Sequence, residues 1–211
     1  MMKRILCYGD SNTWGYDPVG KERFAPDKRW PGVLGMILGN EFCIIEEGLG
    51  GRTTVWDDPI EGYKNGRDYL IPCLETHRPL DLVILMLGTN DLKKRFSLSA
   101  YDVAQGVAVL IKIIQDSIAG PNWQGPPVLL LAPPPIANLT ELTELFEGAE
   151  SKSLKLPEHY QRISQQLRCA FLDTGTVITS SPLDGIHLEE AEHLKLGQAV
   201  SMKVKEILAL N

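Results

Sequence analysis

Five short apolar segments alternate with longer segments whose apolar residues recur at helical spacing, and this alternation is the strongest constraint on the fold. Several of the short segments are continuously apolar, as is typical of parallel strands that helices cover on both faces. We expect strands at residues 3–8, 42–46, 81–87, 127–132 and 169–172. We expect helices near residues 30–38, 66–77, 100–118, 157–168 and 189–209. The pattern predicts a three-layer α/β/α fold with a five-stranded parallel sheet in the flavodoxin-like order 2-1-3-4-5.

The chain is expected to form one domain over residues 1–211. Its length suffices for one substantial core, and no internal repeat, low-complexity tract or linker divides it. The most irregular region, residues 133–156, opens with three consecutive prolines, which exclude a helix interior or a central strand there. We expect a long loop that holds a single helical turn.

The charge balance narrows the class of partner. A net charge of −6 argues against nucleic acid or an anionic membrane surface. The densest basic cluster, Lys93-Lys94-Arg95, is short and is expected to be a solvated loop or helix start. The longest apolar run, residues 82–87, is too short to cross a bilayer. We therefore expect a small-molecule partner and leave a homo-oligomer open.

Two features predict a cytoplasmic location. The apolar stretch after Lys3-Arg4 ends near Tyr8, which is shorter than the core of a signal peptide. The four cysteines form no Cys-x-x-Cys pair, and three of them lie in apolar segments. We therefore expect buried free thiols rather than disulfide bonds or a zinc site. These cysteines are Cys7, Cys43, Cys73 and Cys169.

Glycine and polar residues follow each of the first three predicted strands, at residues 9–11, 48–52 and 88–91. In open α/β sheets, ligands bind beyond the carboxyl ends of the strands, where the strand order reverses. We expect these three segments to meet at one crevice. Ser11, in the first of them, could be a nucleophile if a base takes its proton, or simply a turn or helix N-cap residue.

Four histidines are candidates for that base. His187 differs from the others because Asp184 lies three residues earlier, so the carboxylate can accept Nδ1–H and leave Nε2 free. An Asp184 that only caps the following helix explains the pattern equally well. His77 suits a helix C-terminus, and His159 and His193 are expected at the surface.

Acyl transfer also needs hydrogen-bond donors for the developing oxyanion. The backbone N–H groups of Ser11 and Gly51 and the side-chain amide of Asn90 are the candidates. Taken singly, Asn90 could be a turn residue and Gly51 a helix-entry glycine. Asp10 and Asp91 are expected to hold their loops by hydrogen bonds to the backbone.

The combination of these motifs resembles the GDSL, or SGNH, hydrolase family. Four blocks stand in the family's order, and they look most like its arylesterase/acyltransferase branch: Gly9-Asp10-Ser11, Gly51, Gly88-x-Asn90-Asp91 and Asp184-x-x-His187. The resemblance implies a Ser11 nucleophile, a His187 base oriented by Asp184, and an oxyanion hole from Ser11, Gly51 and Asn90. Asn12 replaces the leucine of the family's name, and Gly50 competes with Gly51 as the donor.

On this basis we expect a serine esterase that cleaves short-chain aryl or alkyl esters through an acyl-enzyme, without cofactor or metal, and that can also transfer acyl groups to alcohols. Alternatives with the same triad are a carbohydrate O-deacetylase, a thioesterase or a lysophospholipase. A more distant alternative is a non-catalytic phosphate-binding module. Bulky apolar residues of the loops suggest an apolar substrate entrance, although each of them could simply pack its loop onto the domain. We expect substrate contacts from Trp14, Trp56, Leu92 and Phe96, with Tyr16, Ile136, Leu139 and Leu142 around them.

Overall fold

The computed structural model describes residues 2–209. Five parallel strands form one sheet in the order β2-β1-β3-β4-β5, and the predicted fold class and strand order are both confirmed. The strands are β1 (Lys3–Gly9), β2 (Phe42–Gly48), β3 (Leu82–Met86), β4 (Val128–Ala132) and β5 (Ala170–Asp173).

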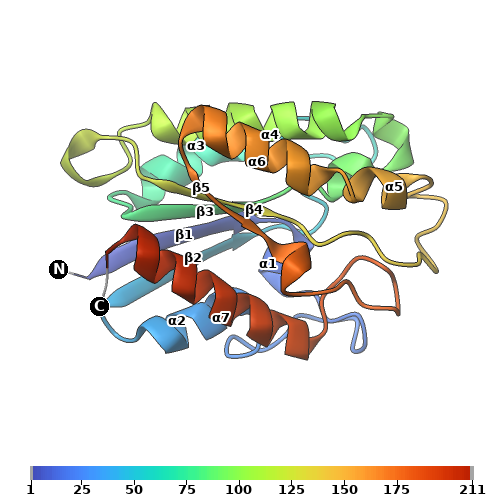
Figure 1. Ribbon diagram of the computed structural model, residues 1–211, viewed down its shortest axis with the longest axis horizontal. Helices are drawn as coiled ribbons and strands as arrows, with labels where there is room; N and C mark the ends of the chain where they lie inside the picture. Colours follow the sequence, from blue (N-terminus) through green and yellow to red (C-terminus); the bar gives the residue numbers. More distant parts are fainter. Residues whose placement is uncertain (1, 210–211) are drawn as a thin grey trace.

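Helices cover both faces of the sheet (Figure 1). One face carries α2 (Trp30–Leu38) and α7 (Glu190–Ile207), and the other carries α3 (Gly66–His77), α4 (Ala100–Gln115) and α6 (Leu156–Leu167). Short elements complete the chain: α1 (Ser11–Trp14), α5 (Ala149–Ser153), and the 3-10 turns η1 (Asn90–Leu92), η2 (Lys94–Phe96), η3 (Pro121–Trp123) and η4 (Thr174–Thr176).

The strand sequences are apolar because both faces of the sheet are buried. Along β1, Ile5 and Cys7 pack against the layer of α2 and α7, while Leu6 and Tyr8 pack against the layer of α3, α4 and α6. All four side chains are fully buried. Two cores, one on each face, therefore account for the continuous apolar runs of the central strands.

Several boundaries differ from the sequence-based expectation. The helix expected at 100–118 is α4, which begins after a capping box between Ser99 and Asp102 and ends at Gln115. The prediction for residues 133–156 is confirmed: the segment is a long loop with one short helix, α5, which leads almost directly into α6. The last helix covers Glu190–Ile207, and no helix among residues 2–209 has the length and hydropathy needed to span a membrane.

The register of the sheet brings the three glycine-containing segments together. Gly9 at the end of β1 pairs with Gly48 of β2 on one side and with Met86 of β3 on the other. The chain segments that leave these strands therefore start from the same edge of the sheet, as expected.

Candidate active site

Ser11 is the first residue of α1, immediately beyond the end of β1. The Asp10 carboxylate accepts a hydrogen bond from the Asn12 backbone N–H, at 3.0 Å, and so caps this short helix. A Cβ at Gly9 would lie 2.1 Å from Thr13 Oγ1, so only glycine lets α1 fold back against the strand. Ser11 is half-buried and lies at the carboxyl edge of the sheet.

A chain of hydrogen bonds connects Ser11 with His187 and Asp184. His187 Nε2 lies 3.0 Å from Ser11 Oγ, and His187 Nδ1 lies 2.6 Å from Asp184 Oδ2. The other carboxylate oxygen accepts the backbone N–H groups of Ile186 and His187, each at 2.9 Å. When Nδ1 carries the proton, Nε2 can accept the serine hydroxyl proton. The arrangement thus supports nucleophilic chemistry at Ser11.

The turn that carries His187 needs a glycine. Gly185 has φ +82°, and a Cβ there would lie 2.8 Å from the carbonyl oxygen of Asn138. The Gly185 carbonyl accepts the Ala137 backbone N–H at 2.8 Å. The loop after β4 therefore packs against the turn from Asp184 to His187 and is hydrogen-bonded to it.

Hydrogen bonding keeps Asp184 ionised. Burial by itself raises the pKa of this carboxyl, but the hydrogen bonds from the His187 ring and from the backbone outweigh burial and leave the pKa below its ordinary value. The Tyr16 ring lies against the imidazole, with 4.3 Å between ring centroids. The imidazole of His187 thus faces a carboxylate on one side and an aromatic ring on another.

Asn90, in η1 beyond β3, connects the first two blocks of the site. Its side-chain amide donates to the Arg52 carbonyl at 3.1 Å and lies 3.5 Å from Asp10 Oδ2. Gly51 has φ +80°, the left-handed conformation that favours glycine. The structure thus brings Asn90 beside the segments of Ser11 and Gly51, while the choice of Gly51 over Gly50 as a donor remains a prediction.

Asp10 and Asp91 hold the loops, and this prediction is confirmed. Asp91 accepts the Thr54 backbone N–H at 3.0 Å and the Thr54 hydroxyl at 2.5 Å. It thereby ties the loop after β3 to the loop after β2. Burial raises the pKa of both carboxyls to about 6, although hydrogen bonds from Asn12 and Thr54 partly offset this effect.

Arg52 is a structural residue of the site that belongs to no recognised sequence motif. It is buried at 3 % exposure. Its guanidinium donates to the Gly9 carbonyl at 2.8 Å and to the Glu47 carbonyl, and lies 4.1 Å from the centre of the Tyr8 ring. Arg52 therefore ties the ends of β1 and β2 together. Only its place directly after Gly51 could have indicated this role.

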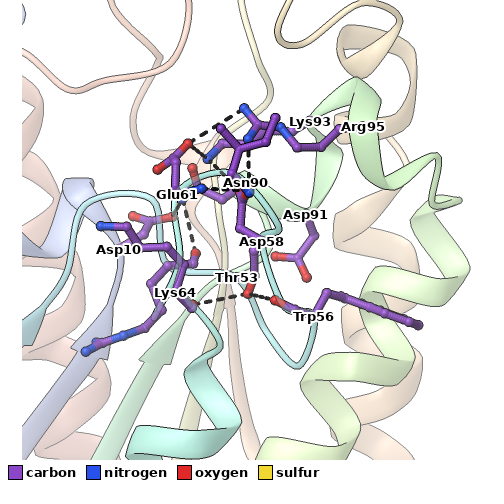
Figure 2. A network of polar contacts seen from close by, with 12 residues as sticks. Asp10, Thr53, Trp56, Asp58, Glu61, Lys64, Asn90, Asp91, Lys93 and Arg95 are labelled. Atoms are coloured by element: carbon purple, nitrogen blue, oxygen red, sulfur yellow. Dashed lines mark hydrogen bonds and ion pairs between the residues drawn. The ribbon is translucent and has the colours of Figure 1, made fainter.

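A buried ion cluster also lies beside the site, and here the prediction of a solvated basic cluster is wrong for Lys93 (Figure 2). Lys93 is 3 % exposed and pairs with Asp58 and Glu61. Arg95 Nη1 lies 2.8 Å from Asp58 Oδ1. A Cβ at Gly51 would lie 2.5 Å from Glu61 Oε2. The cluster therefore holds the loop of Asp58 and Glu61 against the Gly51 turn.

Fewer apolar residues than expected are available to contact a substrate, because some of them belong to the core. Leu92 is 1 % exposed and packs in the core formed by α3, α4 and α6, so it is corrected from a substrate contact to a core residue. Ile136 is buried in the same core, while Leu139 and Leu142 pack against it. Trp56 is exposed, and the candidates that keep part of their surface exposed are Trp14, Tyr16, Phe96, Leu139 and Leu142.

The remaining histidines lie elsewhere. His193 is fully buried, contrary to expectation: its Nδ1 accepts the Trp30 backbone N–H at 3.3 Å. Burial lowers the pKa of His193 to about 4. His77 contacts Glu47, and His159 lies against the Tyr101 ring.

A parallel α/β sheet with a Ser–His–Asp chain at its carboxyl edge defines the class of α/β serine hydrolases. Within this class, similarity to a family profile identifies the family. The chain belongs to the GDSL-like lipase/acylhydrolase family, whose profile matches residues 7–194. It is a GDSL-type carboxylic ester hydrolase with the SGNH hydrolase fold, so the predicted family, enzyme class and fold are confirmed.

Solved structures are similar over nearly the whole chain. The native aryl esterase of M. smegmatis is 45 % identical with a TM-score of 0.93, covering 97 % of this chain and 99 % of that one. A carbohydrate acetylesterase family member from Sinorhizobium meliloti is 37 % identical with a TM-score of 0.94, covering 99 % and 100 %. A search of curated protein sequences found no match.

Proposed function

We propose that this enzyme hydrolyses short-chain aryl and alkyl esters through an acyl-enzyme on Ser11. The observation that carries the proposal is the position of His187, whose Nε2 lies 3.0 Å from Ser11 Oγ while Nδ1 lies 2.6 Å from Asp184. In this geometry one imidazole can take the serine proton while a carboxylate fixes its tautomer. The chemistry requires no metal or cofactor.

The reaction proceeds in two halves. Ser11 Oγ attacks the ester carbonyl while His187 Nε2 takes the hydroxyl proton, and the imidazolium that forms is stabilised by Asp184. His187 then donates the proton to the leaving alcohol, and the acyl group stays on Ser11. Water, activated by the same imidazole, releases the acid. A second alcohol in place of water gives acyl transfer.

The oxyanion of each tetrahedral intermediate would be held by the Ser11 and Gly51 backbone N–H groups and the Asn90 amide. Asn90 has one N–H on the Arg52 carbonyl at 3.1 Å. The same nitrogen lies 3.5 Å from Asp10 Oδ2, at the limit of a hydrogen bond. We therefore expect the N–H that the Arg52 carbonyl does not engage to donate to the oxyanion.

The entrance supports a preference for small acyl groups on apolar alcohols. Trp14 and Tyr16, at the end of α1, and Trp56, in the loop after β2, keep exposed surface, and the Tyr16 ring lies against His187; aromatic rings suit aryl alcohols. We expect acyl groups from acetyl to about butyryl. The 45 % identity to an aryl esterase favours the same substrate class.

Deacetylation of carbohydrates is the second candidate. The Sinorhizobium meliloti relatives that are named carbohydrate acetylesterases are 37 % and 38 % identical to this chain. Thioesterase or lysophospholipase activity would use the same triad. We place the enzyme in the cytoplasm, acting on a small ester rather than on nucleic acid or a membrane.

A panel of chromogenic esters distinguishes these candidates. Values of kcat/KM should be measured for aryl esters from acetate to palmitate, for a peracetylated sugar and for acetylated xylan, on wild type and Ser11→Ala. We expect short aryl esters to be preferred and Ser11→Ala to be inactive. A sugar acetate or long-chain ester preferred by more than about tenfold, about 1.4 kcal/mol in the transition state, contradicts the proposed substrate class.

A further inference from the structure

A second group of chemically reactive side chains lies between β2 and α3, outside the hydrogen-bonded chain of Ser11. It consists of Glu47 on β2 and of Cys73 and His77 on α3. One ligand atom from each residue lies within 4.8 Å of the other two. His77 Nε2 and Glu47 Oε1 are 2.8 Å apart.

The fold brings these three residues together. Cys73 and His77 are four positions apart on α3, so they lie on the same face of the helix, one turn from each other. Cys73 is 1 % exposed, whereas the side chains of His77 and Glu47 are 24 % and 20 % exposed. The thiol therefore forms the inner end of the group, and the imidazole and carboxylate form its opening to solvent.

The donor set suits a metal ion of intermediate softness. Thiolate, imidazole and carboxylate are the ligands of tetrahedral zinc, with bonds of about 2.0–2.3 Å and ligand atoms about 3.3–3.6 Å apart. The Glu47 and His77 atoms would have to separate by about half an ångström to reach such spacing. Cys73 Sγ, which lies within 4.8 Å of the other two ligand atoms, would have to come closer to them by up to about 1.2 Å. The side chains of Glu47 and His77 are partly exposed, so they have room to adjust.

We propose that Glu47, Cys73 and His77 form a binding site for a thiophilic divalent cation such as Zn²⁺, with water as a fourth ligand. The thiolate and carboxylate supply two negative charges, which balance the charge of the ion. The positive charge of Arg52 acts on Cys73, but its guanidinium donates its hydrogen bonds to the carbonyls of Gly9 and Glu47 and lies over the Tyr8 ring.

Binding must release a proton. Burial, aided by the Glu47 charge, raises the pKa of the Cys73 thiol to about 12, so the metal-free protein holds this thiol protonated. The cation forms its bond to sulfur as the S–H bond breaks, and the proton leaves to solvent. No redox change occurs. The bound ion would connect the end of β2 with the last turns of α3 and so stabilise the fold.

Cobalt binding tests the site directly, because Co²⁺ thiolates absorb in the near ultraviolet. The full chain, free of any affinity tag and of bound metal, is titrated with Co²⁺ and then with competing Zn²⁺. We expect a charge-transfer band that Zn²⁺ removes. Cys73→Ser should abolish the band, and His77→Gln should weaken Co²⁺ binding about tenfold or more, because one of three protein ligands is lost. The matched controls Cys169→Ser and His159→Gln should behave as wild type.

Thermal unfolding gives an independent measurement. Zn²⁺ should raise the melting temperature of wild type and of His159→Gln, but not of His77→Gln or Glu47→Gln. If Cys73→Ser does not fold, His77→Gln and Glu47→Gln still test the proposal. Absence of the cobalt band in wild type, or a band that survives in His77→Gln with unchanged affinity, means that Glu47 and His77 form only an ion pair and overturns the proposal.

Discussion

The Asn12 side-chain amide donates a hydrogen bond to the Ile186 carbonyl, 3.2 Å away, across 174 positions of sequence. Asn12 follows Ser11 in α1, and Ile186 precedes His187, so the contact ties the proposed nucleophile to the proposed base. Asn12 is also the residue that departs from the leucine of the family pattern. Here the departure supplies a bond that a leucine could not make.

Replacement of Asn12 tests this role. Asn12→Ala leaves the buried Ile186 carbonyl without its donor, so we expect a loss of about 1–2 kcal/mol in the free energy of unfolding. We also expect kcat to fall about tenfold, because Ser11 and His187 are less well aligned. Steady-state kinetics and urea unfolding measure both. Asn40→Ala, at an exposed position, serves as the control; an unchanged kcat in Asn12→Ala contradicts the alignment role.

Asn90→Ala should lower kcat by about 10²–10³, as the loss of one oxyanion donor does in other enzymes. KM should change little, because the donor acts on charge that develops in the transition state. Initial rates measured over a range of concentrations of a short aryl ester give kcat and KM separately. A large rise in KM at constant kcat makes Asn90 a substrate-binding residue instead.

Neighbouring lysines provide a matched test of the buried ion cluster. Lys93→Met removes a cation that is 3 % exposed and leaves Asp58 and Glu61 with less compensation, so we expect a loss of about 3 kcal/mol in stability. Lys94→Met breaks an exposed pair with Glu147 and should cost less than about 1 kcal/mol. Denaturant unfolding measures the free energy of unfolding of both variants and of wild type. Equal losses for the two variants contradict the structural importance of Lys93.

His193 should make stability depend on pH. Its pKa is lowered from 6.5 to about 4 in the folded protein, so between these values the unfolded chain binds a proton that the folded chain does not. Stability therefore falls as the pH drops from 6.5 toward 4, by about 3 kcal/mol at 1.36 kcal/mol per pKa unit.

The control for this prediction is His193→Asn, in which the side-chain oxygen can still accept the Trp30 N–H. Asp10 and Asp91, with pKa values raised to about 6, act in the opposite direction over the same range, so the informative quantity is the difference between the two proteins. We expect the stability of wild type relative to His193→Asn to decline on acidification. A difference independent of pH shows that His193 does not titrate in this way.

Features that depend on neighbouring residues could be predicted from the sequence, whereas contacts between distant residues could not. The parallel sheet and its order were predictable because buried strands have a local signature of continuous apolar residues. The positions of Ser11 and His187 were predictable because their motifs are short. Lys93 and His193 were not, because their partners Asp58 and Trp30 lie 35 and 163 positions away, and one sequence does not reveal such pairs.

Covalent labelling tests the central claim most directly. A fluorophosphonate reacts with a serine that has both an activating base and an oxyanion hole. Mass spectrometry of the intact protein and of its peptides should show a single adduct, on the peptide that carries Ser11, formed together with complete loss of esterase activity. Ser11→Ala should remain unlabelled and inactive, and His187→Ala should be labelled far more slowly. An adduct on a different serine, or esterase activity that persists in Ser11→Ala, contradicts the account.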